Sequence, residues 1–107
     1  MQKKILIVEA EERIALALER RLRARGYAPE ICADHNLAAE RFQDDRPDMV
    51  IISLTLPHDG GMAICAELRK QALGGLVPIL LLGSGSEGIR SVPEAIAAGA
   101  DHFFLKL

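Results

Sequence analysis

Two polar side chains follow apolar segments, at places where a parallel sheet would present reactive groups. Ser53 follows residues 48–52, which are apolar from Met49 onward and precede a loop marked by proline and glycine. Glu9 follows a second apolar segment, residues 4–8. In a parallel α/β sheet the carboxyl ends of the strands form the ligand crevice. We therefore expect Ser53 to lie at the reactive position of such a crevice, where it presents a hydroxyl group.

Apolar and amphipathic segments alternate along the chain. The apolar segments, which we predict to be strands, are residues 4–8, 27–33, 48–52, 77–82 and 102–106. The amphipathic segments, which we predict to be helices, are residues 11–25, 36–44 and 61–73, with a short one beginning near Pro93. Strands that are apolar throughout and separated by single helices favour a parallel sheet covered on both faces. Right-handed crossovers then limit the fold to a doubly wound five-stranded α/β sheet.

Residues 11–25 carry the clearest helical pattern. Ile14, Leu18 and Leu22 are spaced by four and form one apolar stripe. An acidic start and an arginine-rich end complement the helix dipole. We therefore interpret the arginines as a solvated helix end rather than as a docking patch.

The bulk composition fits one compact domain. The 107 residues are 50% hydrophobic and 26% charged, with a net charge of −2, which gives no electrostatic reason to expect bound nucleic acid or membrane. No apolar run approaches the ~20 residues that span a bilayer, so we expect a cytoplasmic protein. Cys32 and Cys65 are expected to be buried free thiols. The histidines show no metal-ligand spacing, and we predict no metal or other cofactor.

The element order and several short motifs resemble the response-regulator receiver family. The matching segments are Ile-Leu-Ile-Val-Glu-Ala-Glu at 5–11, the loop proline and glycine at 57 and 61, Val-Pro-Ile-Leu-Leu-Leu at 77–82, Ala-Gly-Ala-Asp at 98–101 and Phe-Phe-Leu-Lys at 103–106. The resemblance covers the whole chain and implies a flavodoxin-like receiver fold. It also implies a known chemistry, in which a histidine kinase passes phosphate to an aspartate beside Mg²⁺ held by acidic residues.

Of the three acidic positions that the resemblance implies for that crevice, two are replaced and one is kept. Ser53 replaces the acceptor aspartate, and Ala10 replaces the second acidic residue, whereas Glu9 keeps the first. A seryl phosphate is a stable ester rather than a high-energy acyl phosphate, and Mg²⁺ would lose two of its three carboxylates. We therefore predict a pseudo-receiver that is not phosphorylated and is not an enzyme.

The switch residues of the family are also altered. Gly83 stands where the resemblance implies a hydroxyl, while Phe103 holds the position of the switch aromatic. Lys106 keeps the lysine of the fifth strand, and Leu107 replaces the proline that follows it. Without the acceptor aspartate, we expect Lys106 to form a structural ion pair with Glu9.

Two alternatives to this interpretation stay open. Gly83-x-Gly-x-x-Gly88 follows a predicted strand and formally matches a dinucleotide fingerprint, so the chain could be a nucleotide- or phosphate-binding module. The motif needs a helix opening directly on the glycines, and Pro93 delays that helix, which favours a flexible loop. The second alternative is a regulator that is phosphorylated at a non-standard acceptor.

These observations lead to a prediction of function. We expect residues 1–107 to be one pseudo-receiver domain in bacterial signal transduction, acting as a protein-protein interaction module. Its partner would be another protein, an appended effector domain or a second copy. The sequence ends directly after the fifth strand, so we expect the last helix of the fold to be absent and the domain to be the N-terminal module of a longer protein.

Overall fold

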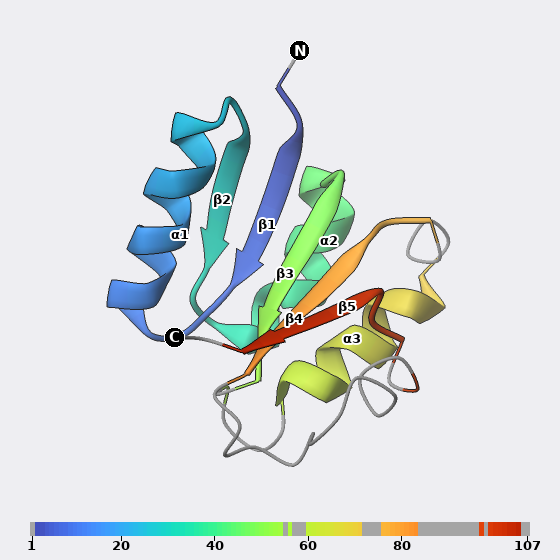
Figure 1. Ribbon diagram of the computed structural model, residues 1–107. Helices are drawn as coiled ribbons and strands as arrows, with labels where there is room; N and C mark the ends of the chain where they lie inside the picture. The colour runs from blue at the N-terminus through green and yellow to red at the C-terminus, as the bar shows by residue number, and fades with distance from the viewer. Residues whose placement is uncertain are drawn as a thin grey trace.

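The computed structural model contains a five-stranded parallel sheet with strand order β2-β1-β3-β4-β5. It describes residues 2–54, 56, 60–71, 76–83, 97 and 99–105. The strands are β1 (Lys4–Val8), β2 (Ala28–Cys32), β3 (Met49–Ser53), β4 (Ile79–Gly83) and β5 (His102–Leu105) (Figure 1). The helices are α1 (Glu12–Ala24), α2 (Ala38–Asp45) and α3 (Gly60–Lys70), with a 3-10 turn η1 (His35–Leu37) before α2.

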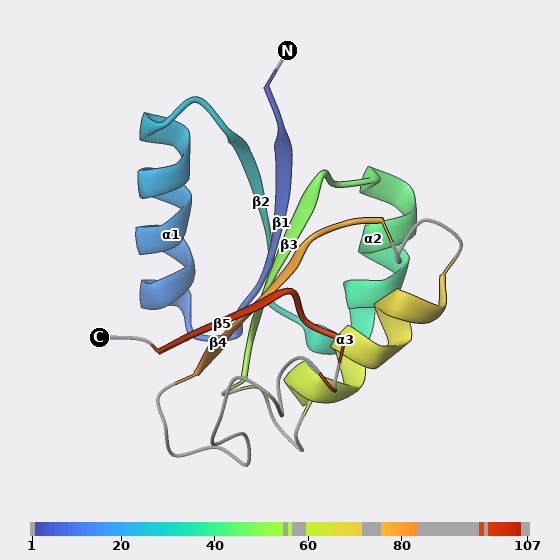
Figure 2. The same ribbon diagram turned by 45° about the vertical axis from the view of Figure 1, so that its right-hand side comes forward.

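The helices lie on both faces of the sheet, as the sequence predicted. Helix α1 covers one face, and α2 and α3 cover the other (Figure 2). The predicted doubly wound, flavodoxin-like arrangement is confirmed, and the observed element ends differ from the predicted ones by a few residues at most. The helix predicted to begin near Pro93 lies largely outside the described residues.

Alternate residues of the strands fill two apolar clusters. The larger cluster, on the side of α2 and α3, includes Leu6, Val8, Val50, Ile52, Ile79 and Leu81. The smaller cluster, on the side of α1, has only Ile5, Ile7 and Ile51 as fully buried members. Because side chains of a strand alternate between faces, each of the strands β1 to β4 contributes to both clusters. The two faces are therefore unequally covered.

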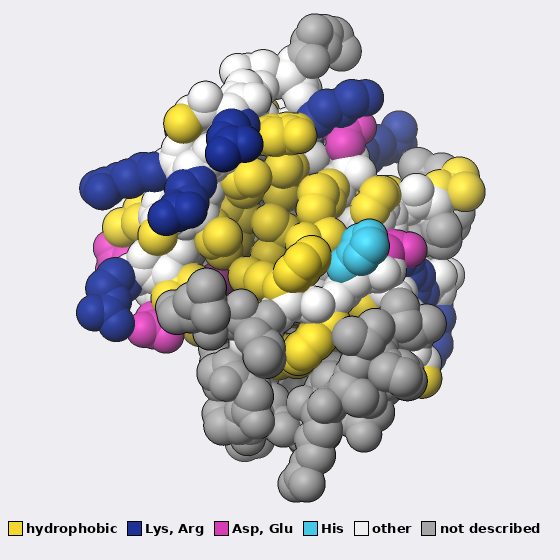
Figure 3. Space-filling model, in the orientation of Figure 1, with side chains coloured by type: hydrophobic (Ala, Val, Ile, Leu, Met, Phe, Trp, Pro, Cys, Tyr) yellow, Lys and Arg dark blue, Asp and Glu magenta, His cyan; other side chains and the backbone are white. Residues whose placement is uncertain are grey.

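The face beside α1 remains open to solvent over part of the sheet. Ile14, Leu18 and Leu22 lie on the predicted stripe of α1, but each is only half-buried. Figure 3 shows hydrophobic side chains gathered in a continuous field over this face. Phe104 is 51% exposed and, by its pairing with Leu82, projects to the same side.

Cys32 and Cys65 are buried free thiols in the larger cluster, which confirms the prediction for both. Burial raises the pKa of each thiol above its usual value, more than nearby arginines lower it. The Cys32 thiol also donates a hydrogen bond to the Asp34 carbonyl at 3.1 Å. Both are therefore inert packing groups.

One arginine joins α3 to the segments that lead into β4 and β5. The Arg69 side chain donates to the carbonyls of Gly99 and Val77, each at 2.6 Å, and pairs with the Asp101 carboxylate at 2.5 Å. The same carboxylate oxygen accepts the Ile79 N–H at 2.8 Å. The Arg69–Asp101 pair thus fixes the amino-terminal ends of two neighbouring strands against α3.

Candidate functional site

The carboxyl ends of β1 and β3 bring Glu9 and Ser53 to the same edge of the sheet. Val8 pairs with Ile52, so the residues that follow each of them are neighbours across the two strands. Glu9 is 2% exposed and Ser53 is 1% exposed. The sequence prediction that these two side chains share a crevice therefore agrees with the register of the sheet.

The carboxylate of Glu9 interacts with the start of α1. Its Oε2 atom accepts the N–H of Glu11 at 3.3 Å, and Glu11 occupies the N-cap position of the helix. The Glu9 N–H donates to the Cys32 carbonyl at 3.2 Å. Ala10, by contrast, is exposed and offers only a methyl group. A carboxylate held by a backbone N–H at a helix start is electrostatically favourable, so Glu9 has a structural role there.

Ser53 is closed in from one side by the first turn of α3. A β-carbon on Gly61 would lie 2.4 Å from the Ser53 carbonyl oxygen and 3.1 Å from the Leu54 α-carbon. The first distance is shorter than real β-carbon contacts and the atom it meets is backbone, so only glycine permits this approach. The loop glycine singled out in the sequence therefore has a steric reason, while the loop proline at 57 lies outside the described residues.

Gly83, the last residue of β4, lies against the side chain of Phe103, the second residue of β5. A β-carbon on Gly83 would lie 3.1 Å from the Cε2 and Cζ atoms of Phe103 and 3.1 Å from Cδ1 of Leu54. Phe103 is half-buried and packs against the larger apolar cluster. The ring therefore occupies space that a side chain at residue 83 would need.

Several predicted features fall outside the described residues. Lys106 is one of them, so its ion pair with Glu9 stays a prediction. The glycine loop is described only at Gly83, and the nucleotide-binding alternative likewise stays open. Calorimetric titration with common nucleotides and phosphates would test that alternative.

The crevice does not fit the Mg²⁺ site that the resemblance implies. In the described part of the chain, no group of three or more His, Cys, Asp or Glu side chains is arranged to hold a metal ion. Mg²⁺ is strongly hydrated and prefers several oxygen ligands in octahedral geometry. A hydroxyl at 53 and a methyl group at 10 leave Glu9 as the one carboxylate of the family's three positions. These donors do not match that metal.

Sequence reasoning missed the roles of Arg69 and Arg46. Asp101 belongs to a quoted motif, but its partner Arg69 is 32 residues away and carries no sequence signal that links the two. Arg46 adopts a left-handed conformation with φ 46° and ψ 61°, although it precedes a proline. A residue before proline normally prefers extended backbone, so the sequence predicts the opposite.

Comparisons with known proteins agree with this geometry. Residues 5–107 match the response regulator receiver domain family. The alkaline phosphatase synthesis transcriptional regulatory protein PhoP of Bacillus subtilis (strain 168) is 33% identical over 106 residues, which cover 99% of this chain and 43% of that protein. The chain spans less than half the length of the curated relatives it matches.

Solved structures show the same fold. The chemotaxis protein CheY4 of Vibrio cholerae superposes with a TM-score of 0.88 at 26% identity, over 99% of this chain and 88% of that one. The receiver domain of the sensor histidine kinase PA1611 of Pseudomonas aeruginosa PAO1, which has a magnesium ion in its active-site cleft, superposes with a TM-score of 0.85 at 27% identity, over 99% of this chain and 86% of that one. Because strand order, crevice position and sequence match coincide over nearly the whole chain, it belongs to the response regulator receiver domain family.

Proposed function

We propose that this receiver domain does not accept a phosphoryl group and acts instead by binding a protein partner. The observation that carries the proposal is the buried Ser53 hydroxyl at the end of β3, where the family's acceptor carboxylate would lie. A carboxylate forms an acyl phosphate whose hydrolysis is strongly favourable, whereas a serine ester does not discharge in the same way. Ser53 therefore cannot reproduce a transient phosphorylated state.

The surroundings of Ser53 support the same proposal. Phosphoryl transfer depends on positive charge that offsets the phosphoryl oxygens and on an accessible nucleophile. Ser53 has 1% of its surface exposed, and Ala10 contributes no metal ligand beside it. Glu9 brings a negative charge, which repels a phosphoryl donor unless a cation is bound.

The contact between Gly83 and Phe103 supports a module with one fixed state. Phe103 already packs against the core, and residue 83 has no hydroxyl that could move with it. A ligand can shift only an equilibrium that exists between two states. We propose that the β4–β5 end presents a constant surface, which a partner recognises without a phosphorylation signal.

We further propose that the domain is the N-terminal module of a longer regulator. The matched relatives are more than twice as long as the aligned region, and the open apolar face beside α1 is a surface that another segment, an effector domain or a second copy could cover. Within the described residues, no helix is both long and apolar enough to cross a bilayer. A cytoplasmic location stays a prediction from the sequence.

Intact-mass spectrometry tests the proposal directly. The protein is incubated with acetyl phosphate and Mg²⁺, and we expect no gain of about 80 Da, the mass of one phosphoryl group. A receiver that keeps all three carboxylates serves as the positive control in the same buffer. A stoichiometric gain on this chain would refute the proposal, and peptide mapping would then locate the acceptor.

Restoring the missing carboxylates gives the matched variant. Ala10→Asp with Ser53→Asp returns three acidic side chains to the crevice. We expect this double variant to bind Mg²⁺ and to be less stable than the parent without metal, because clustered carboxylates repel one another. A double variant that is more stable than the parent in a chelating buffer would show that the two positions do not share the crevice with Glu9.

A further inference from the structure

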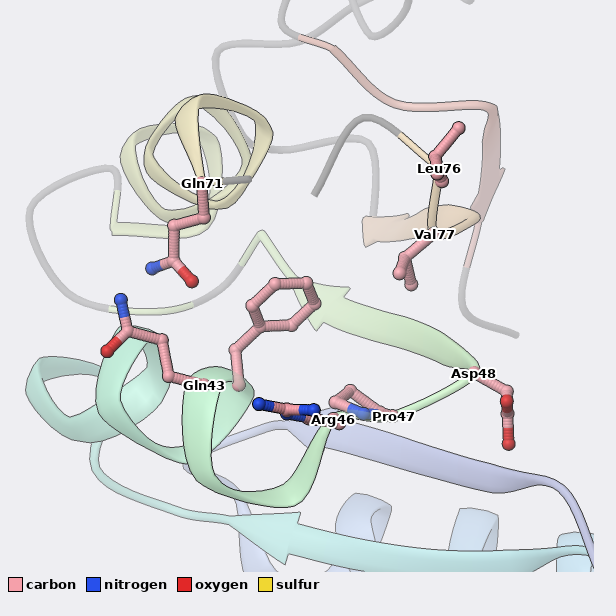
Figure 4. Close-up of a pocket in the computed structure, with 8 residues that line it drawn as sticks. Gln43, Arg46, Pro47, Asp48, Gln71, Leu76 and Val77 are labelled. Atoms are coloured by element: carbon pink, nitrogen blue, oxygen red, sulfur yellow. The ribbon is translucent and has the colours of Figure 1, made fainter. Parts of the chain in front are cut away.

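A concave site lies near the amino-terminal ends of β3 and β4, at the other end of the strands from Glu9 and Ser53. It is formed where α2 ends, where α3 ends and where the chain enters β3 and β4 (Figure 4). Its volume is about 540 Å³, within the usual range for sites that bind small molecules or short peptide segments. The residues that matter for its chemistry are Phe42, Gln43, Arg46, Gln71, Leu76 and Val77. We call this site the α2–α3 groove.

The groove contains a buried hydrogen-bond acceptor that is not satisfied. The Oε1 atom of Gln71 is buried, and no hydrogen-bond partner for it is found among the described residues. Buried polar atoms are almost always paired in native proteins, so an exception needs an explanation. Figure 4 shows Gln71 extending from α3 toward Gln43, which extends from α2 on the facing wall. A ligand N–H that approaches Oε1, on the side of the amide away from Gln43, would satisfy this acceptor.

The groove also contains a positively charged side chain, that of Arg46. Arg46 is exposed, and within the described part of the chain its guanidinium takes part in no ion pair or hydrogen bond. Its left-handed backbone is held by a bond from its N–H to the Phe42 carbonyl at 3.1 Å. A guanidinium binds a carboxylate through two parallel N–H groups. The fixed backbone limits the directions in which Arg46 can present that fork.

Apolar surface completes the groove. Phe42 is buried to 4% exposure and Val77 is half-buried, whereas Leu76 is 83% exposed at the rim. When a partner's aliphatic side chain packs on such an exposed leucine, apolar surface is removed from water, which favours binding. The groove therefore combines an apolar contact, an acceptor that needs a donor, and one positive charge.

We propose that the α2–α3 groove binds an extended segment of a partner protein in which a single carboxylate side chain lies next to an aliphatic one. A carboxylate of the segment pairs with Arg46, a main-chain N–H donates to Gln71 Oε1, and an aliphatic side chain packs between Phe42 and Leu76. A nucleotide or other polyanion fits less well, because Asp48 also lines the groove and Arg46 is the one cationic residue among the described residues of its lining. This site is independent of the proposed loss of phosphorylation at Ser53, so either proposal can fail without the other.

NMR titration of the uniformly ¹⁵N-labelled 107-residue chain tests the proposal with two blocked dipeptides. The probe is Ac-Leu-Glu-NH2, and its neutral counterpart is Ac-Leu-Gln-NH2. At millimolar concentration we expect the acidic probe to shift the side-chain amide signals of Gln43 and Gln71 and to bind roughly two- to five-fold more tightly than the neutral one, as for an exposed ion pair. Equal affinity for the two probes, or shifts confined to other parts of the chain, would overturn the proposal.

Two variants separate the groove from general charge effects. Arg46→Gln should abolish the preference for the acidic probe, whereas Arg25→Gln, which removes one positive charge at the end of α1 on the other face of the sheet, should preserve it. Gln71→Leu should weaken both probes by a similar factor, because it removes the acceptor and leaves Arg46 in place. Unfolding curves of each variant confirm that a loss of binding is not a loss of fold. Retained preference in Arg46→Gln would exclude the groove as the site.

Discussion

The ring of Phe103 lies against Gly83, and a β-carbon at residue 83 would stand 3.1 Å from two of its ring atoms. Contacts this short require the ring or the strand to move. The glycine and the phenylalanine are therefore mutually dependent: the first has no side chain, and the second fills the space that results.

We predict that Gly83→Thr destabilises the protein by about 1–3 kcal/mol, the usual range for an overpacked core position. Chemical denaturation measures this change in the free energy of unfolding. In a Phe103→Leu background the smaller side chain leaves room, so the same substitution should cost less. Equal costs in both backgrounds would show that the ring does not limit residue 83.

Millisecond dynamics give a second measurement on the same pair. Because Gly83 has no side chain to exchange places with Phe103, relaxation-dispersion experiments should detect no exchange concentrated at these two residues. In Gly83→Thr, exchange should appear at Phe103 as the ring moves between packed and displaced positions. Strong exchange already present in the unsubstituted protein would argue for a two-state switch.

Gly61 and Gly60 are neighbours in α3 with opposite expected responses to alanine. Gly61→Ala places a β-carbon 2.4 Å from the Ser53 carbonyl, so we expect a loss of at least about 2 kcal/mol. Gly60→Ala meets the edge of the His35 ring at 3.1 Å, and that side chain can rotate away. Alanine is also the better helix former, so the second substitution should be neutral or stabilising. Similar losses in thermal unfolding would contradict the close approach of α3 to β3.

The stability of the domain should fall in acid partly through Asp101. Burial alone would raise the pKa of this carboxyl, but hydrogen bonds from the Ile79 N–H and from Arg69 outweigh it and lower the pKa below the usual 3.8. The stabilisation is therefore complete above 3.8 and is lost as the pH falls through the lower folded value.

Asp101→Asn removes the stabilisation that depends on the charge of this carboxylate. The difference in unfolding free energy between the parent and the variant should therefore shrink as the pH falls below 3.8. The carboxylate is 48% exposed, so solvent screening limits the effect to about 1 kcal/mol. Asp44→Asn, on the surface of α2, is the matched control. A difference that stays constant with pH would mean that Arg69 does not act through the charge of Asp101.

The open apolar face should drive association of the 107-residue chain. Phe104 projects from the edge strand β5 onto the same side as Leu80 and Leu82, and an apolar field of this kind favours contact between molecules. Light scattering should show concentration-dependent self-association that Phe104→Asp reduces. Leu37→Asp, which changes an exposed leucine on η1, should leave it unchanged. A strictly monomeric parent at high concentration would contradict the prediction.

The fold was predictable because β1, β3 and β4 are almost entirely apolar runs and amphipathic helical segments lie between the strands. Segments such as Ile79–Gly83 have little polarity, which favours a parallel sheet with helices on both faces. Element ends were less certain, since they depend on local capping. Asp34, for example, accepts the Asn36 N–H at 2.9 Å and starts a 3-10 turn where the sequence indicated an α-helix.

The crevice was predictable to the extent that its residues lie at strand ends. Position in the sequence alone places Glu9 and Ser53 together, because parallel strands end at one edge. The α2–α3 groove was not predictable in this way, since it depends on the left-handed turn at Arg46 and on the side-chain direction of Gln71. Neither property produces a periodic pattern in the sequence that would reveal it.

The alkylation rates of the two buried thiols report how often the domain opens. Cys32 and Cys65 are enclosed in the larger cluster, and only the thiolate form of an accessible cysteine reacts rapidly with an alkylating reagent. Reaction at either sulfur must therefore wait until the surrounding layer separates. Cys32 reports on the side of β2 and Cys65 on α3, so the ratio of their alkylation rates shows whether the molecule opens in parts or all at once.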